Sequence, residues 1–489
     1  MIKPIAFAAM TIGLISGSAA YAQPACGNAP VRYDIRHGAG TTFHVEAEFA
    51  ATSGQFDIGW RTAEGTEDGP VDFIRSVEGR DDAGNWHAAD YDGYGTWLLP
   101  EADTRAYDAV RYDILAEHDR AVWNIGKEEI AYRFDDAFYF VGSPVLVADY
   151  GWSDCTFEVT VDGPSDWTTV AAWAQREDGT YQADGLTELL RNIFVTGPGL
   201  EPRTMRIGEM DVTLLAQDEL REGGPALETL LDETLGRYVD LFGSAPMDRY
   251  LVVFGEGRMN DGGAFANSFG QRVLSPLRMS EQLLWSRLLA HEALHAWIGI
   301  TIRPENAFDL QWFTEGGADY LTAKTLYRSG QIDEHDLIFT IEGQVRRFLL
   351  GRISSGSIGL IEAGVEKQQN RQLVYGGGAL FHLFLDAEMT ARTGAGSYEA
   401  VMRQLYESSN APYSIERLMQ VLDDASGGSA SEIYAFLNEP LDPNAVTERL
   451  TRIGLPTAAF GPDELLVRFT AGDCEGTREA RCVPVYLAR

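Results

Sequence analysis

The sequence predicts a multidomain α+β protein with an N-terminal antiparallel β domain, a mixed α/β centre and a C-terminal helical domain. Three observations support this fold class. Residues from about 30 to 215 show short segments with partial alternation of apolar and polar side chains, separated by Gly, Asp and Asn. Near Pro225 the apolar spacing becomes helical, and from Phe313 onward nearly every segment keeps that spacing. The length of 489 residues suits about three domains.

The composition excludes two broad classes of protein. Hydrophobic residues make up 45% of the chain and aromatic residues 11%, which is enough for packed cores and rules out wholesale disorder. The 73 acidic and 39 basic side chains give a formal net charge of -34, which repels phosphate backbones and rules out nucleic-acid binding as the main function. This charge favours basic peptides only weakly, because it is spread along the chain.

The N-terminus has the parts of a secretory signal peptide. Lys3 supplies the positive start, residues 5–15 are apolar, and Ala20-Tyr21-Ala22 is a small-x-small cleavage site. The apolar run is too short for a membrane anchor, and no later stretch reaches the roughly 20 apolar residues of a membrane helix. We therefore expect a signal peptide over residues 1–22, a periplasmic or secreted location, and no membrane span.

Four cysteines suit an oxidising compartment. Cys474 and Cys482 could close a small loop, and Cys26 and Cys155 would then tie the mature N-terminus to a later part of the β domain. Three pairings are open, and the sequence does not choose among them. Cysteine ligation of a metal is not expected, because the chain has no CxxC pair.

The β domain is expected over residues 23–215, with strand-like segments at residues 42–49, 132–140 and 155–161. A mixed α/β domain is expected over residues 216–350. It begins with a helix at residues 226–242, a strand at 250–254 and a Gly-rich loop that includes Gly262 and Gly263. Ser280 is the expected N-cap of a long helix that runs to about Ile298.

A helical domain is expected over residues 351–460, before a disulfide-closed tail at 461–489. The helical segments from Phe313 onward are residues 315–327, 335–350, 377–393, 397–406 and 414–423.

The central helix contains a metal-site signature, His291-Glu292-Ala293-Leu294-His295. Histidines at i and i+4 project from one helical face, so both rings can reach a single ion. Glu292 stands beside them as a base for a zinc-activated water. The alternative is an ordinary pair of histidines, but a buried charge without a partner is costly and a metal supplies that partner.

A catalytic zinc site needs a third protein ligand, and Glu315 is the best candidate because it stands where the next helix begins. A histidine third ligand of the extended HExxHxxGxxH type is excluded, since Ile298 and Thr301 occupy the required positions. Asp319 follows Glu315 by one helical turn and could accept the outer N–H of a ligating imidazole. The alternative for Asp319 is a solvated surface aspartate.

These motifs resemble the glycyl aminopeptidase family of zinc metallopeptidases, which are gluzincins related to thermolysin and to the aminopeptidase N group. The resemblance spans roughly residues 30 to 430. It is strongest at His291–Trp297, Ile302-Arg303-Pro304 and Trp312–Gly316, and it continues weakly at residues 164–171, 226–250, Tyr375–Ala379, Leu385-Asp386 and Thr393-Gly394.

The resemblance implies a thermolysin-like catalytic domain with Zn²⁺ held by His291, His295 and Glu315. It implies that Glu292 is the general base that later donates the proton, and that Tyr375 donates a hydrogen bond to the tetrahedral oxyanion. An ordinary aromatic residue at a helix start is the alternative for Tyr375.

The chain departs from the family pattern in three places. Related aminopeptidases carry a glutamate that binds the substrate ammonium, and here Ala264 or Phe265 takes its place, with Glu256 as a conceivable substitute. Backbone groups of Gly263 and Ala264 could still bind an extended substrate. Gly377 stands where the family usually has lysine, and no counterpart of the family's PDZ domain is found in the sequence.

The leading hypothesis is an exported zinc metallopeptidase that acts on peptides or proteins, with aminopeptidase action as the family default. An endopeptidase of the same fold is the near alternative, because the ammonium-binding glutamate is missing. A non-catalytic peptide-binding relative is the alternative from another class, and nothing specific favours epoxide hydrolysis.

Overall fold

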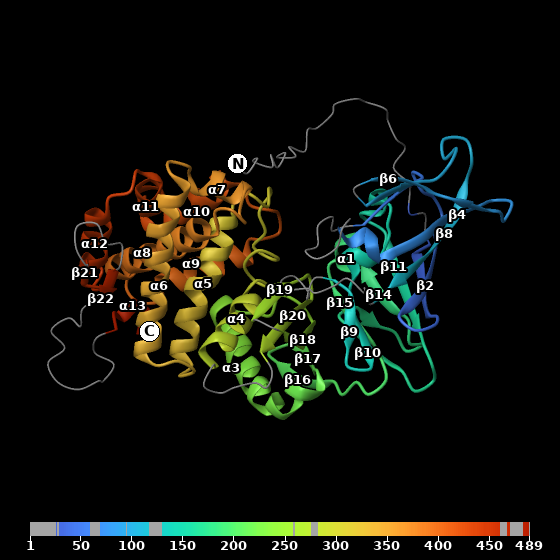
Figure 1. Cartoon of the computed structure of the whole chain (residues 1–489). Coiled ribbons are helices and arrows are strands. Elements are labelled where there is room, and N and C mark those ends of the chain that lie inside the picture. The colour runs from blue at the N-terminus through green and yellow to red at the C-terminus, as the bar shows by residue number, and fades with distance from the viewer. Residues whose placement is uncertain are drawn as a thin grey trace, which may run out of the picture.

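The computed structural model describes residue 26 and residues 29–58, 69–93, 95–116, 130–257, 260–274, 282–459, 467–469 and 483–488. Figure 1 shows a β-rich region, a central sheet flanked by helices, and a helical region, in chain order. The predicted α+β fold class is therefore confirmed. The expected signal peptide, the N-cap at Ser280, and both Cys474 and Cys482 lie outside the described residues.

The N-terminal region is built from three sheets. The 8-stranded sheet consists, in spatial order, of β13 (Ala174–Gln175), β14 (Tyr181–Asp184), β11 (Thr156–Asp162), β1 (Val31–His37), β2 (Thr42–Glu48), β8 (Tyr107–Leu115), β4 (Ile74–Asp81) and β5 (Trp86–Ala88). The second sheet consists of β12 (Thr168–Ala171), β15 (Ile193–Gly197), β10 (Ala137–Val141) and β9 (Tyr132–Phe134). The third consists of β3 (Gln55–Asp57), β7 (Thr96–Leu98) and β6 (Asp90–Gly93). Pairing in this region is antiparallel except between β1 and β11, which run parallel.

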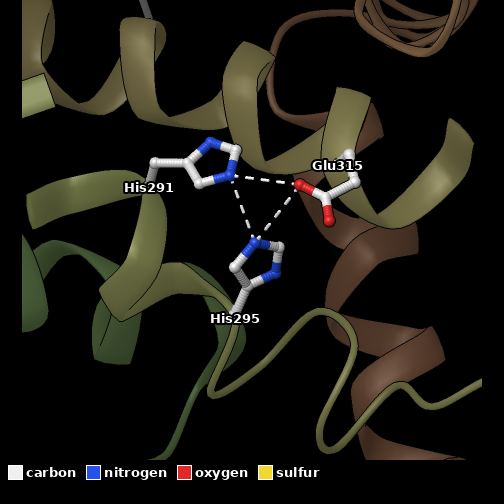
Figure 2. A group of neighbouring side chains, drawn as sticks. All are labelled: His291, His295 and Glu315. Atoms are coloured by element: carbon white, nitrogen blue, oxygen red, sulfur yellow. Dashed lines mark hydrogen bonds and ion pairs between the residues drawn. The ribbon is translucent and has the colours of Figure 1, made fainter. Parts of the chain in front are cut away.

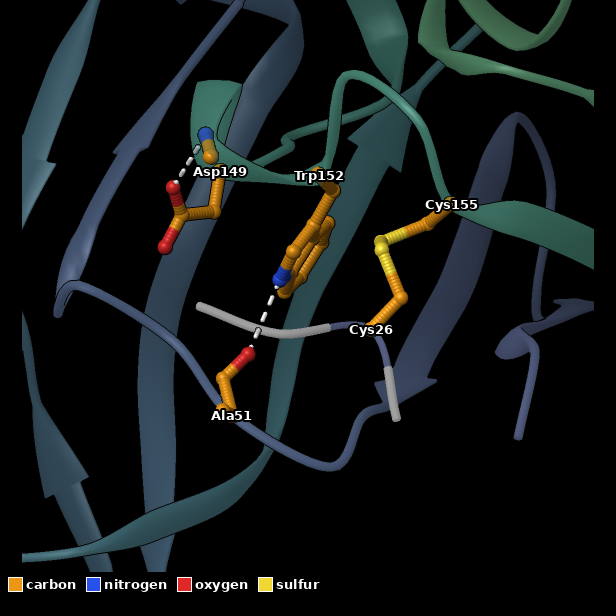
Figure 3. Close-up of a disulfide and its surroundings, with 6 residues drawn as sticks. Cys26, Ala51, Asp149, Trp152 and Cys155 are labelled. Carbon is orange, nitrogen blue, oxygen red and sulfur yellow. Dashed lines mark hydrogen bonds between the residues drawn. A yellow bond between two sulfur atoms is a disulfide. The ribbon is translucent and has the colours of Figure 1, made fainter. Parts of the chain in front are cut away.

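A disulfide joins Cys26 to Cys155, one of the pairings that the sequence left open. Each cysteine comes shortly before one of the two parallel strands, β1 and β11, so the bond ties the starts of adjacent strands together. Figure 3 shows the buried Trp152 ring beside this bond, where its indole N–H donates to the Ala51 carbonyl at 2.9 Å. Cys26 is therefore anchored to the core of this region.

The segment at residues 132–140, predicted as one strand, is instead a hairpin of β9 and β10. Asp135 occupies the turn with a φ of 56°, a conformation that aspartate tolerates better than most residues. All five residues of β10 are buried because the sheet is covered on both faces. Phe138 and Phe140 join the core under the 8-stranded sheet, whereas Tyr139 and Val141 face the central sheet.

The central sheet has the order β16 (Arg203–Ile207), β17 (Met210–Ala216), β18 (Arg249–Gly257), β20 (Ser268–Leu274) and β19 (Asp261–Ala264). Strands β17, β18 and β20 run parallel, and β19 pairs antiparallel with β20 at the edge. Strands β16 and β17 precede the domain boundary expected near residue 215, yet they pair with the catalytic sheet. Helix α3 (Gly224–Phe242) connects β17 to β18, and its apolar face packs into the same core as that sheet.

The remaining chain is mainly helical, and Figure 1 shows these helices packed as one body. The principal helices are α4 (Gln282–Leu294), α5 (Gln311–Arg328), α6 (Glu334–Ser355), α7 (Leu360–Val365), α8 (Arg371–Thr393), α9 (Ser397–Glu407), α10 (Ile415–Ser426), α11 (Ser429–Asn438) and α12 (Pro443–Arg452). None of the described helices is both long and apolar enough to cross a bilayer. No PDZ domain is found in the part of the chain that the structure describes.

His382 of α8 is a buried link to neighbouring helices. Its Nε2–H donates to the Phe313 carbonyl of α5 at 3.0 Å, and its Nδ1 accepts from the Tyr398 hydroxyl of α9 at 2.6 Å. Burial disfavours the charged ring and lowers the pKa of His382 to about 4, from about 6.5 for a free histidine.

Because the unfolded chain takes up this proton first, we expect stability to fall as the pH drops from about 6.5 to about 4. The contribution of His382 over this range is about 3 kcal/mol, and it is retained in full above pH 6.5. Thermal unfolding of the wild type and of His382→Gln between pH 7 and pH 4.5 measures it. The wild type should lose more stability on acidification, and parallel curves for the two proteins would contradict this assignment.

Candidate metal centre

Two histidines near the end of α4 face one point, as Figure 2 shows. His291 lies in the last turn of the helix and His295 directly follows it. The helix ends at Leu294 rather than near Ile298, because the chain tightens into a turn in which the Trp297 amide donates to the Leu294 carbonyl. The two Nε2 atoms are nevertheless only 3.2 Å apart.

Glu315 of α5 completes the cluster. Its Oε2 lies 3.3 Å from the Nε2 of His291 and 3.6 Å from the Nε2 of His295. Zinc bonds of about 2.0–2.1 Å at tetrahedral angles place neighbouring ligand atoms about 3.3 Å apart. The three donor atoms therefore fit three corners of a tetrahedron around Zn²⁺, and the fourth corner is left to water or substrate.

Hydrogen bonds on the outer side of each ring select the tautomer that ligation requires. The Nδ1–H of His295 donates to the Ile298 carbonyl at 3.0 Å, and the Nδ1–H of His291 donates to Asp319 Oδ1 at 3.0 Å. Each Nε2 is therefore left with a lone pair directed into the cluster. This is the position that the sequence predicted for Asp319, and the alternative of a solvated aspartate is wrong because Asp319 is buried.

Asp319 is held by three further side chains. Its Oδ2 accepts from Gln344 at 2.7 Å and from Arg347 at 2.9 Å, and Arg287 lies 3.6 Å from Oδ1. These two hydrogen bonds and the two arginine cations stabilise the buried carboxylate of Asp319 and keep it ionised. Asp319 therefore stays oriented toward His291.

The electrostatics of the cluster favour a positive charge between the rings. Burial opposes the charged form of His291, but hydrogen bonds to Asp319 and Glu315 outweigh it and raise the pKa of His291 to about 10. Burial likewise opposes the charged form of Glu315, yet Lys367 and the two histidines hold the pKa of that carboxyl well below its usual range. A divalent cation satisfies the same carboxylates when the imidazoles are neutral.

Glu292 packs against the edge strand of the central sheet. A Cβ added at Gly262 would lie only 3.0 Å from Glu292 Cγ, so the strand approaches the glutamate more closely than a larger residue would permit. Gly263 and Ala264 follow on β19, whose residues pair with β20 on one side only among the described strands. Glu292 and the edge strand are thus neighbours.

Tyr375 lies on α8 beside the cluster. Its ring stacks on that of His291, with centroids 6.1 Å apart and planes inclined by 19°. Burial and the nearby Glu315 raise the pKa of Tyr375 well above its usual value, so the phenol stays protonated and can donate a hydrogen bond. Tyr375 lies near the start of α8, and its ring is buried beside His291.

Other candidates lie away from the cluster. Glu256 is on β18, separated from the edge strand β19 by β20. Phe265 is buried in the core between the central sheet and the β domain, with Leu251 and Val253. Neither residue therefore places a carboxylate on the edge strand β19.

Sequence reasoning missed the cations and the amide around the site: Arg287, Gln344, Arg347, Lys367 and Arg371. Arg287 precedes His291 by one helical turn, so helical spacing could have revealed it. Lys367 is one of only four lysines in the chain, and this scarcity could have marked it as a candidate site residue. Gln344 and Arg347 lie on another helix and carried no such signal.

A sequence model of the M61 glycyl aminopeptidase family matches residues 285–354, the segment that contains His291, His295 and Glu315. The predicted family resemblance is confirmed. With the cluster that fits Zn²⁺, the match makes this chain a zinc-dependent metallopeptidase of the aminopeptidase-like kind. A search of curated protein sequences gave no match.

Solved structures of an aminopeptidase N family protein and of an M1 zinc metallopeptidase share the fold. An aminopeptidase N family protein from Idiomarina loihiensis aligns with a TM-score of 0.73 at 18% identity, over 88% of this chain and 79% of its own. An M1 zinc metallopeptidase from Deinococcus radiodurans aligns with a TM-score of 0.55 at 15% identity, over 84% of this chain and 94% of its own. A mutant of that metallopeptidase with a bound Tyr-Ser-Ala substrate has a TM-score of 0.54 at 14% identity, with the same coverage. At identities of 14–18%, this likeness shows that the chain has the same fold as these proteins.

Replacing His291 with alanine should abolish zinc binding, because it removes one of three donors and the imidazole that Asp319 orients. Metal analysis of the purified protein is the measurement. His335→Ala is the matched control, since His335 is exposed on α6. Zinc retained at the wild-type level in His291→Ala would exclude His291 as a ligand.

Proposed function

We propose that the chain is an exported zinc metallopeptidase that hydrolyses peptide bonds, with His291, His295 and Glu315 as ligands and Glu292 as the general base. The observation that carries the proposal is the position of Glu292, next to three converging donor atoms and against the edge strand β19. A base between a metal site and a strand edge can meet a water molecule and a bound peptide together.

The roles of the side chains follow from their chemistry. Bound Zn²⁺ supplies Lewis acidity, which polarises the scissile carbonyl and acidifies the attacking water. Glu292 accepts the proton of that water and later delivers it to the leaving amine. Tyr375, protonated in its buried position, donates a hydrogen bond to the oxygen that gains negative charge in the transition state. Asp319 keeps His291 in the required tautomer throughout.

The substrate backbone is proposed to lie along β19. Gly263 and Ala264 can offer their backbone groups to an extended peptide, which would add a strand beside the edge of the sheet. Their small side chains leave the peptide close to Glu292. The tripeptide bound to the Deinococcus radiodurans mutant supports short peptides as a substrate class.

Export is proposed from the sequence of residues 1–22, and cleavage after Ala22 would free Gln23 as the mature N-terminus. The Cys26–Cys155 disulfide supports an oxidising location, the periplasm or the exterior.

Two modes of cleavage remain open, aminopeptidase and endopeptidase. Aminopeptidase action is the family default, whereas the lack of a carboxylate at Ala264 and Phe265 favours tolerance of a blocked N-terminus. The test compares N-acetylated and free peptides of identical sequence, with a chelator-treated sample as the control. Hydrolysis of free peptides alone supports the aminopeptidase, and equal hydrolysis of both supports the endopeptidase. Absence of chelator-sensitive hydrolysis for every peptide would overturn the proposed function in favour of the non-catalytic relative.

A further inference from the structure

Basic side chains gather around Tyr375 and Glu315. Lys367 Nζ forms an ion pair with Glu315 Oε1, the oxygen turned away from the histidines. The Lys367 ammonium and the Arg371 guanidinium each lie 5.5 Å from the centre of the Tyr375 ring, and the Arg347 guanidinium lies 4.5 Å from it. The side of the site formed by the start of α8 is therefore cationic.

These three cations differ in how many of their N–H donors already have partners within the protein. Arg347 donates to Asp319 and to Gln372, and Lys367 is held by Glu315. Arg371 is exposed and its guanidinium lies over the Tyr375 ring. Desolvation opposes its charge, but the nearby Tyr375, Glu315 and Asp261 raise the pKa of Arg371. A guanidinium carries five N–H donors in a planar fork, so Arg371 retains donors for a ligand.

The charges at the site balance before the metal is counted. Among the described side chains at the site, and with both imidazoles neutral as ligation requires, four carboxylates face four cations: Asp261, Glu292, Glu315 and Asp319 against Arg287, Arg347, Lys367 and Arg371. Zn²⁺ then adds two positive charges, which an anionic group of the substrate would offset.

The overall charge of -34 does not prevent an anionic group from binding at the site. At physiological salt, exposed charges more than about 8 Å apart are largely screened from each other. The side chains in contact with the substrate therefore outweigh the carboxylates spread over the rest of the surface.

We propose that Arg371, with Lys367 beside it, binds a carboxylate of the substrate next to the metal centre. This inference rests on the proposed function and names its substrate class, namely peptides with an acidic side chain or a free C-terminal carboxylate close to the scissile bond. Arg371 matches the planar geometry of a carboxylate with two parallel N–H donors, and Lys367 adds a second positive charge.

The first experiment measures kcat/KM for short peptides that differ in one carboxylate. One arm compares a free C-terminal acid with its amide, and the other places Asp or Asn at each position of a peptide with an amidated C-terminus. We expect a preference of about ten- to hundredfold for the carboxylate in at least one arm, and its loss in Arg371→Gln. Arg371→Lys should retain part of it, and Arg371→Glu should reverse it in favour of lysine-containing peptides.

Arg36→Gln is the matched control, since Arg36 is an exposed arginine of β1 whose partner is Asp34. It should leave the preference unchanged. Equal kcat/KM for acidic and neutral peptides in both arms, or a preference that survives in Arg371→Gln, would overturn the inference.

The second experiment measures binding without turnover. Fluorescently labelled peptides of both arms are titrated into the Glu292→Gln protein, with and without Arg371→Gln, and followed by fluorescence anisotropy. Tighter binding of the carboxylate form, lost with Arg371→Gln, supports the inference even if the wild type hydrolyses no peptide. Equal affinities for acidic and neutral forms would refute it, whether or not the proposed peptidase activity is found.

Discussion

Replacing Glu292 with glutamine should lower kcat/KM for peptide hydrolysis by about 10²–10⁴-fold while zinc stays bound. Glutamine has nearly the same shape and still fits against Gly262, but it cannot accept a proton. The three donor atoms of His291, His295 and Glu315 are untouched by the change. The measurements are steady-state kinetics with the best peptide substrate and metal analysis of the same preparation.

Glu256→Gln is the matched control for this variant. Glu256 lies on β18, two strands from the edge that faces Glu292, so its replacement should leave hydrolysis within about twofold of the wild type. Full activity of Glu292→Gln would refute the assigned general base. Equal losses of hydrolysis in the two variants would point to a general folding defect and not to the loss of a base.

Replacing Gly378 with alanine should lower both stability and activity, because α5 and α8 cross there backbone to backbone. A Cβ at Gly378 would lie 1.8 Å from the Trp312 carbonyl oxygen, and the facing Gly316 is equally crowded by Gly378. The two helices would have to separate, and they carry Glu315 and Tyr375 respectively. We expect a loss of about 3 kcal/mol in unfolding free energy and of about 10²-fold in kcat/KM.

Thermal unfolding and steady-state kinetics check this prediction. Gly343→Ala is the matched control, since Gly343 is a helical glycine of α6 with no heavy atom within 4 Å of an added Cβ. Alanine there should be neutral or should stabilise the protein by up to about 1 kcal/mol, through its higher helix propensity. A Gly378→Ala protein with wild-type melting temperature and activity would show that the crossing can relax freely.

Local patterns predicted the parts of this protein that depend on short-range geometry. The i, i+4 spacing of His291 and His295 places both rings on one helical face, whatever the rest of the chain does. Helical spacing also predicted α3, α9 and α10 to within a few residues. It misplaced the end of α4, where a tight turn takes over after Leu294.

One prediction failed because a turn lies inside a strand-like run. Residues 132–140 show partial alternation and were predicted as one strand, but Asp135 and Asp136 form the turn between β9 and β10. The sequence showed Gly377 as a departure from the family's pattern. In the structure its neighbours Gly376 and Gly378 meet the backbones of α6 and α5.

The amino-acid sequence by itself determined the paired imidazoles, the glutamate between them and the order of β and helical regions, since these depend on residues a few positions apart. Only the tertiary structure decided that Asp319 orients His291, that Lys367 and Arg371 stand at the metal centre, and that α8 lies against α5. The physical reason is that such contacts join residues from different helices. Their partners are selected by packing and charge in the folded core, which no local spacing records.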